Sequence, residues 1–171
     1  MIKIIGAVLL IAGTAAWGLS GVIRLRNRAK NLSALCYAVG AMRSEICDRL
    51  TPTPEVLEML SGEAQYPANL LFNNASERMM SIGTQPFSVI WRGAVENTPE
   101  LLLNGGEAEV LCELGLFLGR YNVEEQRSAF DHAERRLEEM THKAEAVRDT
   151  NSRMHAFLGV AAGIFAVVIL I

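Results

Sequence analysis

The side chains that could support chemistry are few and widely spaced in this sequence. Cys36, Cys47 and Cys112 form no C-x-x-C pair, and each lies among apolar or helical neighbours. We therefore predict reduced core thiols, with neither a disulfide nor a zinc site. The histidines stand ten and thirteen positions apart, which is not a metal-ligand spacing: they are His132, His142 and His155.

Other segments that resemble catalytic motifs are incomplete. Asn104-Gly105-Gly106-Glu107 lacks the Lys and the Ser/Thr of a phosphate-binding loop, so we expect a turn there. Ser33, Ser44 and Ser76 have no flanking glycines that would form a nucleophile elbow. The many glutamates alternate with Arg and Lys, as on solvated helix faces. The sequence therefore predicts no enzyme, no cofactor and no small-molecule substrate.

A basic stretch, VIRLRNRAK at Val22–Lys30, carries four positive charges. It could be a nucleic-acid patch, a lipid-surface contact, a partner site or a membrane topology signal. The net charge of −3 and the lack of accompanying aromatics or a wider basic face argue against nucleic acid. Positive residues next to a membrane helix mark its cytoplasmic side, which is the interpretation we favour. Contact with anionic lipid headgroups is compatible with it.

The membrane interpretation depends on two charge-free apolar runs at the ends of the 171-residue chain. Twenty residues, Ile4–Ile23, would span roughly 30 Å of hydrocarbon as a helix. The second run, Ala156–Ile171, has sixteen residues and would have to stand nearly upright or thin the bilayer. A cleaved signal peptide and a buried core helix are the respective alternatives. We predict transmembrane helices at residues 1–23 and 156–171.

Charges flanking the second run predict the same orientation as the first. Lys143, Arg148 and Arg153 precede it, so the domain between the runs should face the cytoplasm, with both termini outside. Gly159 and Gly163 form a Gly-x-x-x-Gly pattern that could let another membrane helix approach closely. The glycine-rich first run is its nearest potential partner.

The sequence pattern predicts helices throughout residues 24–155. Leu35, Val39, Met42 and Ile46 recur at four- and three-residue steps, which predicts one buried face on a helix that continues from the first membrane run. Prolines and N-cap residues predict short helices that follow. The expected segments are 55–60 after Thr53-Pro54, 67–80, a helix opened by Pro86, a start at Thr98-Pro99, and 108–118 before Gly119.

The last predicted helix is long and amphipathic. Its apolar positions follow heptad-type steps: Val123, Phe130, Ala133, Leu137, Met140, Ala144 and Val147. Its other face mixes charges, with Asp131–Arg135 and Glu139–Lys143 as expected i,i+4 pairs. No Gly or Pro interrupts residues 120–158, so this helix too can continue into the membrane. The predicted fold is all-α, an antiparallel helical bundle between two terminal membrane helices.

In this layout the sequence resembles the stage III sporulation protein AB family of endospore-forming bacteria. The matching segments run in order along nearly the whole chain: Ile5-Gly6-Ala7-Val8, Glu45-Ile46 with Thr51-Pro52, Trp91 with Ala94, Leu114-Gly115-x-x-Leu118-Gly119 with Gln126, and Asn151, Met154 and Leu158-Gly159-x-x-x-Gly163. Two positions depart from the family pattern. Asn122 stands where members often have Asp, and Thr53 replaces a common Leu.

The resemblance implies a fold and a role. The family is similar to the six-helix cytoplasmic domain of type II secretion and type IV pilus inner-membrane platform proteins. It implies membership in the complex that links mother cell and forespore, on the mother-cell side of the cell membrane. A secretion-type ATPase and other membrane subunits are the implied partners, with an assembly platform as the role.

Within this framework five residues are candidates for partner binding: Glu45, Thr51, Glu55, Glu125 and Gln126. Turn geometry is the alternative for Thr51, and helix solvation or a bundle hydrogen bond is the alternative for Glu45 and Gln126. A two-helix membrane sensor or channel-associated subunit is the competing function. Only Thr14 and Ser20 are polar within the membrane runs, which argues against conduction.

Overall fold

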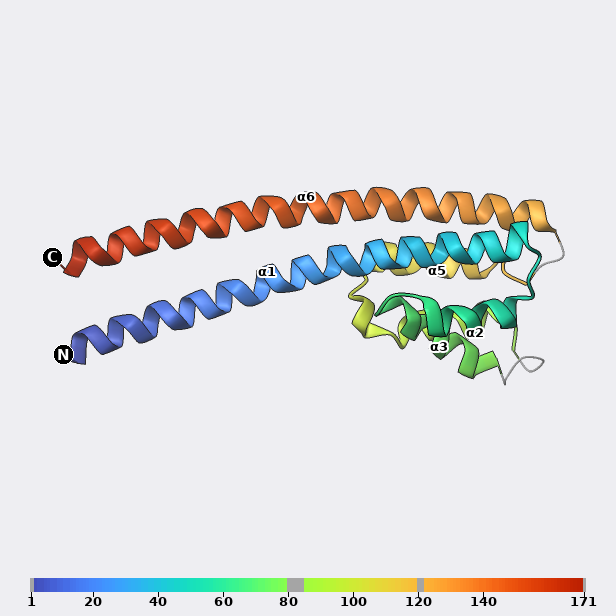
Figure 1. Ribbon diagram of the computed structural model, residues 1–171, viewed down its shortest axis with the longest axis horizontal. Coiled ribbons are helices and arrows are strands. Elements are labelled where there is room, and N and C mark those ends of the chain that lie inside the picture. Colours follow the sequence, from blue (N-terminus) through green and yellow to red (C-terminus); the bar gives the residue numbers. More distant parts are fainter. Residues whose placement is uncertain (1, 80–84, 120–121, 171) are drawn as a thin grey trace. The chain divides into compact units, whose positions relative to one another are not determined.

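Helices are the main regular elements of the described chain, and short connections join them (Figure 1). The computed structural model describes the backbone at residues 2–79, 85–119 and 122–170, and side chains at residues 23–79, 85–119, 122–150 and 154. Six α-helices lie in these ranges: α1 (Ile2–Arg43), α2 (Thr53–Glu63), α3 (Ala68–Arg78), α4 (Phe87–Glu96), α5 (Gly105–Gly115) and α6 (Val123–Leu170). The π-helical turn η1 (Ser44–Asp48) follows α1, and the 3-10 turn η3 (Pro99–Leu101) follows α4. The all-α prediction with six helices is confirmed.

The predicted membrane spans, 1–23 and 156–171, lie almost entirely outside the residues whose side chains are described. Ile23 is the exception. Gly159 and Gly163 also lie outside that set. Among the residues that are described, no helix is both long enough and apolar enough to cross a membrane. The two spans and the bundle boundaries at 24–155 therefore stay predictions from the sequence.

The chain divides into two compact units. Residues 30–142 form one unit, and residues 1–29 together with 143–171 form the other. In the second unit Arg148 pairs with Asp149 at 2.9 Å. Val147, which the heptad pattern predicts to be buried, is instead 47% exposed. A heptad pattern identifies a face of a helix but not how far along the helix the packing neighbours extend.

Within residues 30–142 the end of α1 and the beginning of α6 run antiparallel. Three contacts, in order along the first helix and in reverse order along the second, show this direction. Cys36 Sγ lies 3.5 Å from Thr141 Oγ1, Arg43 binds Asp131, and Asp48 of η1 binds Arg127. The ion pair that Asp131 forms is thus with α1, and the expected pairing with Arg135 along its own helix is replaced by this cross-helix contact.

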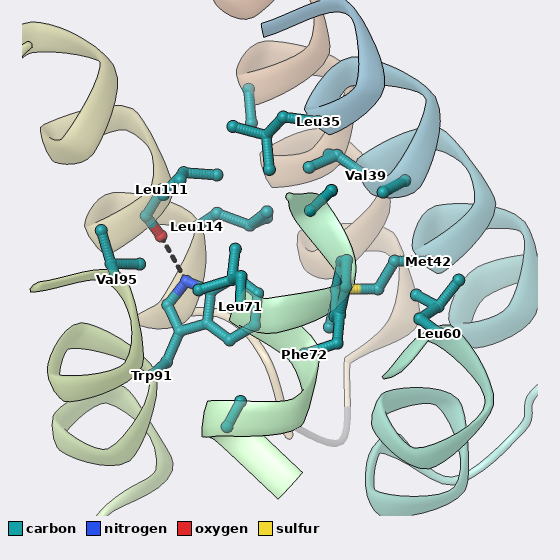
Figure 2. Packing of buried hydrophobic residues seen from close by; sticks show 14 of the residues in the cluster. Leu35, Val39, Met42, Leu60, Leu71, Phe72, Trp91, Val95, Leu111 and Leu114 are labelled. Carbon is teal, nitrogen blue, oxygen red and sulfur yellow. Dashed lines mark hydrogen bonds between the residues drawn. The ribbon is translucent and has the colours of Figure 1, made fainter. Parts of the chain in front are cut away.

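The short helices complete the core of this unit. α2 packs against α3, α3 against α4, and α4 against α5. The predicted seam of α1 is buried, as are the heptad positions Phe130, Ala133 and Leu137 of α6. Trp91 occupies the centre of the core with no exposed surface (Figure 2). Its indole N–H donates to the Leu111 carbonyl at 2.7 Å. The core seams predicted from the periodicity are therefore confirmed within this unit.

The prolines lie at the starts of the short helices. Each helix, however, begins one residue away from the start that the sequence predicts. Pro52 is the N-cap of α2, and Thr53 is its first helical residue with no side-chain capping bond. Pro67 and Pro86 likewise precede α3 and α4. Because proline has a fixed φ and no N–H, it suits both the N-cap and the first turn, so composition alone does not separate these positions. α2 also continues to Glu63, beyond the expected end at Leu60.

The segment at Asn104 differs most from its prediction. The expected turn is instead the start of α5, closed by a capping box. Asn104 Oδ1 accepts from the Glu107 N–H at 2.9 Å, and Glu107 Oε2 accepts from the Asn104 N–H at 2.7 Å. Two glycines disfavour a helix by propensity, but the capping box satisfies two N–H groups at the helix start and offsets that preference. The chain leaves α5 through a turn that ends at Gly119, where φ is +77°.

Candidate partner-binding surface

The end of α1 departs from regular helix geometry at the position of the first candidate residue. The chain forms a π-helical turn at Ser44–Asp48 and then passes through Leu50, whose φ of 58° is left-handed. The Thr51 N–H donates to the Glu45 carbonyl at 2.9 Å and closes the turn. π-helical turns are rare in proteins, and those that do occur are often found at functional sites.

Glu45 holds this turn together. Its carboxylate accepts from Arg49 Nη1 at 2.6 Å and from Thr51 Oγ1 at 3.0 Å, and its side chain is only 13% exposed. The structure thus brings Glu45 and Thr51 into direct contact. Their contacts are those of the alternative interpretation, turn geometry and a bundle hydrogen bond, and their role in partner binding stays a prediction.

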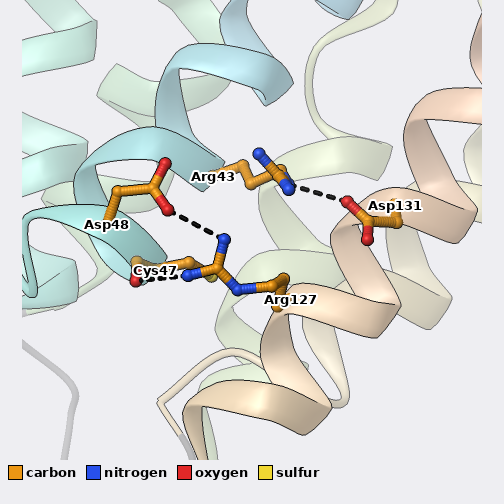
Figure 3. Close-up of polar contacts among 5 residues, drawn as sticks. All are labelled: Arg43, Cys47, Asp48, Arg127 and Asp131. Atoms are coloured by element: carbon orange, nitrogen blue, oxygen red, sulfur yellow. Dashed lines mark hydrogen bonds and ion pairs between the residues drawn. The ribbon is translucent and has the colours of Figure 1, made fainter.

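Arg127 joins the same turn to α6 (Figure 3). Its guanidinium donates to Asp48 Oδ1 at 2.8 Å and to the Cys47 carbonyl at 2.9 Å. The hydrogen bond to Asp48 raises the pKa of Arg127 above its ordinary value. The helix pattern puts Arg127 on a charged face, but nothing in the sequence indicates that this face meets the end of α1. The contacts of Arg127 with the end of α1 therefore could not be predicted from the sequence.

The start of α6 separates the other two candidates. Asn122 Oδ1 accepts from the N–H groups of Glu124 and Glu125 at 3.1 and 3.3 Å, so it caps the helix with the acceptor oxygen that Asp would also supply. Gln126 is buried, whereas Glu125 lines a surface groove. Adjacent residues point about 100° apart around an α-helix. Glu125 and Gln126 therefore do not belong to one surface.

The groove beside Glu125 lies between α6 and the end of α5. Phe117 and Ala129 are its apolar lining residues, and Ser128, His132 and Arg135 line it together with Glu125. The neighbouring Leu116 is 48% exposed. Glu55 stands elsewhere, exposed in the first turn of α2, where a carboxylate interacts favourably with the helix dipole. The five candidate residues thus occupy four separate environments.

The thiols have the buried environment expected from the sequence. Cys47 and Cys112 are buried, and Cys36 is partly buried beside Thr141. Burial raises the pKa of all three thiols above the ordinary cysteine value. Within the described ranges, no group of three or more His, Cys, Asp or Glu side chains is arranged to hold a metal ion.

Removing the carboxylate of Glu45 should destabilise the turn. Because Glu45→Ala deletes two hydrogen bonds to a charged acceptor, we expect a loss of unfolding free energy of about 1.5–3 kcal/mol. Chemical denaturation followed by circular dichroism measures this loss. The control is Glu58→Ala, which removes an exposed carboxylate from α2. Equal stability of the two variants would show that Glu45 does not hold the turn.

Glu134 of α6 predicts a pH dependence of stability. Its carboxylate lies against α1, where a Cβ at Gly40 would be 3.5 Å from Oε1. Burial raises the pKa of Glu134 above its ordinary value; Arg43 opposes the shift, and Asp131 and Glu138 add to it. The folded chain therefore holds this proton more tightly than the unfolded chain. Ionisation of Glu134 thus lowers stability as pH rises from the ordinary glutamate pKa through the raised one.

Glu134→Gln should remove this pH-dependent loss. We expect the variant to be more stable than the wild type at neutral pH, by less than about 1 kcal/mol because solvent screens the partly exposed group. Thermal unfolding at a series of acidic to neutral pH values measures the difference. It should vanish at the acidic end of the series, and Glu58→Gln should show no such trend. A constant difference at all pH values would contradict the assignment to ionisation.

Two of the motifs that carry the family resemblance, those at Trp91 and at Leu114, lie in the core. Trp91 and Ala94 of α4 are fully buried, and Leu114 of α5 is 2% exposed. Gly115 lies so close to the indole that an added Cβ would be 2.4 Å from Trp91 Cδ1. Two motifs that are far apart in the sequence therefore meet in one contact. Their spacing reflects packing between α4 and α5.

Comparison with known proteins agrees with this arrangement. The family described as Stage III sporulation protein AB matches residues 3–171. Stage III sporulation protein AB of Bacillus subtilis (strain 168) is 25% identical over 171 residues, covering 99% of each chain. The solved structure of Stage III sporulation protein AB (SpoIIIAB) is similar in fold, with a TM-score of 0.66 and 22% identity, and the match covers 72% of this chain and 98% of that one. Together with the buried motif residues, the family match over nearly the whole chain shows that this protein belongs to the stage III sporulation protein AB family.

Proposed function

We propose that this sporulation protein is a non-enzymatic platform subunit anchored in the cell membrane at both ends of its chain. In this proposal the bundle at residues 30–142 faces the mother-cell cytoplasm and docks a secretion-type ATPase. Other membrane subunits of the complex that links mother cell and forespore would assemble around it. The bilayer and these proteins are its partners, and nucleic acid is not.

The observation that carries the proposal is the continuity of the two long helices. α1 is one helix from Ile2 to Arg43, and α6 is one helix from Val123 to Leu170. Each contains an apolar terminal run and a segment that packs in the bundle. A helix that continues from an apolar run into the bundle supports an anchor at that end of the chain. The basic residues that follow the first run, among them Arg24 and Lys30, support a cytoplasmic orientation.

Labelling of engineered cysteines tests the topology. The native thiols are poor reporters because Cys47 and Cys112 are buried. Glu58→Cys places a thiol at an exposed position of α2, and Lys3→Cys places one before the first apolar run. With an impermeant maleimide on sealed protoplasts, we expect labelling at position 3 but not at position 58 until the cells are opened. Labelling of position 58 in sealed protoplasts would overturn the cytoplasmic orientation.

Co-purification with the partner ATPase tests docking. Glu45 is unsuitable for charge reversal because its loss disturbs the turn itself. We therefore choose Glu55→Lys and Glu125→Lys, with Glu63→Lys as the matched control at the other end of α2. Recovery of the ATPase should fall for one or both of the first two variants and stay at the wild-type level for the control. Wild-type recovery for all three would exclude Glu55 and Glu125 from the docking surface.

A further inference from the structure

Two unfavourable features coincide at the end of α1. The π-helical turn Ser44–Asp48 is followed by Leu50, which has a left-handed φ of 58° and a side chain 67% exposed to solvent. The left-handed region is unfavourable for any residue with a Cβ, and glycine or asparagine would occupy it more easily. An exposed leucine also contributes little to the core. Folding alone therefore gives no reason for leucine at this position.

The surrounding contacts hold Leu50 in this conformation. On one side Glu45 binds both Arg49 and Thr51, the residues that flank Leu50. On the other side Arg127 binds the Cys47 carbonyl and Asp48 (Figure 3). A strained residue persists where its surroundings determine its conformation in this way, and such residues cluster at binding sites. The leucine is thus presented to solvent on a rigid support.

The charges around Leu50 indicate which kind of surface would accept it. Four carboxylates lie on or next to this turn, at Glu45, Asp48, Glu124 and Asp131, and three guanidinium groups lie there, at Arg43, Arg49 and Arg127. These seven groups leave an excess of one negative charge. Pro52 and Pro54, both exposed, extend the apolar surface beside the leucine. The complementary partner is an apolar pocket with a rim of lysine or arginine.

We propose that Leu50 is the anchor residue by which the bundle is held in such a pocket on the docked ATPase. This inference rests on the proposed function, since it assigns a surface to the docking described there. A side chain that is already fixed in its bound conformation loses little conformational freedom on binding, which favours affinity. The turn at residues 44–52 is therefore a preformed recognition element.

Substitution of the strained leucine separates a binding role from a structural one. Leu50→Gly removes the side chain and relieves the left-handed strain, and Leu50→Asn replaces it with a polar side chain that tolerates the same φ. The matched control is Leu102→Gly, because Leu102 has nearly the same φ, 57°, in the turn after η3. The probe is the purified secretion-type ATPase, and its binding to the full-length protein in nanodiscs is measured by biolayer interferometry at low and high salt.

We expect both Leu50 variants to bind the ATPase at least about tenfold more weakly, the effect of losing one buried leucine side chain. Their thermal midpoints should equal or exceed that of the wild type. Leu102→Gly should bind normally, and higher salt should weaken wild-type binding. Undiminished binding by the Leu50 variants would overturn the anchor role of Leu50 and leave the ATPase proposal intact. Binding of the wild type that does not depend on salt would overturn the proposed lysine or arginine rim of the pocket. Absence of wild-type binding overturns the ATPase proposal and the anchor role together.

Discussion

Replacing Trp91 with alanine should lower the free energy of unfolding of the bundle by about 3–5 kcal/mol, the range for large aromatic truncations in a core. The indole has no exposed surface and lies near two other rings, with centroid distances of 6.1 Å to Phe72 and 6.2 Å to Phe87. It therefore connects α3 and α4. It also reaches α5 through its hydrogen bond to the Leu111 carbonyl. Removal of the ring leaves a cavity bounded by three helices, which cannot all close on it.

Trp91→Phe separates the packing contribution from the hydrogen bond. Phenylalanine retains an aromatic ring but has no N–H for the Leu111 carbonyl. We expect it to cost less than alanine, with about 1 kcal/mol of its loss due to the missing hydrogen bond. Denaturant titration followed by far-ultraviolet circular dichroism measures both variants. A loss below about 1 kcal/mol for Trp91→Ala would contradict the central place of the indole in the core.

Adding a single methyl group at Gly115 should also destabilise the bundle. The new Cβ would lie 2.4 Å from Cδ1 and 3.0 Å from Cγ of Trp91, closer than atoms in contact allow. The ring is packed on its other sides, so the two helices must separate for the methyl group to fit. Overpacking of this kind typically costs about 1–3 kcal/mol. Thermal unfolding of Gly115→Ala tests the expected loss.

Gly62→Ala is the matched control for this substitution. Gly62 also lies near the end of a short helix, α2, but no atom is within 4 Å of the position that its Cβ would take. Alanine should stabilise that helix by about 0.5–1 kcal/mol, because glycine loses more conformational freedom on folding. The two variants are therefore expected to shift stability in opposite directions. A gain for both would show that α4 and α5 do not approach as closely as the contact requires.

A double substitution distinguishes the steric explanation from an intrinsic effect of alanine at position 115. When Trp91 is already alanine, the added methyl group at Gly115 has no ring to meet. The cost of Gly115→Ala should then largely disappear, which gives a strong coupling between the two sites. Equal costs in both backgrounds would place the effect elsewhere.

The helical architecture could be predicted because it depends on local patterns. The spacing of Leu35, Val39 and Met42 identifies a buried face whatever that face packs against. Pro52, Pro67 and Pro86 indicate helix starts because proline lacks the N–H that continues a helix. The start of α5 differs from the predicted turn because the two glycines, Gly105 and Gly106, disfavour a helix by propensity. The capping box that overrides them depends on a reciprocal bond between Asn104 and Glu107.

The partner-binding candidates are harder to predict from local sequence patterns than the helices are. Glu45 and Thr51 belong to one motif of the sequence, and their direct hydrogen bond gives a physical reason for their separation of six positions. Glu125 and Gln126 are neighbours in the sequence but face a groove and the core, respectively. Leu50 and Arg127 could not be identified from the sequence, because neither a left-handed φ nor a contact across 79 positions leaves a periodic signal.

By itself, the sequence determined that this protein is helical and where its apolar faces lie, and its ordered motifs pointed to a sporulation family. These properties follow from hydrogen bonding and side-chain spacing within a few turns of one helix. Only the tertiary structure decided that Gly115 meets Trp91, that Arg127 clamps the end of α1, and that Leu50 is presented to solvent. The reason is physical: each of these depends on which helices meet, and that is set by packing of the whole core.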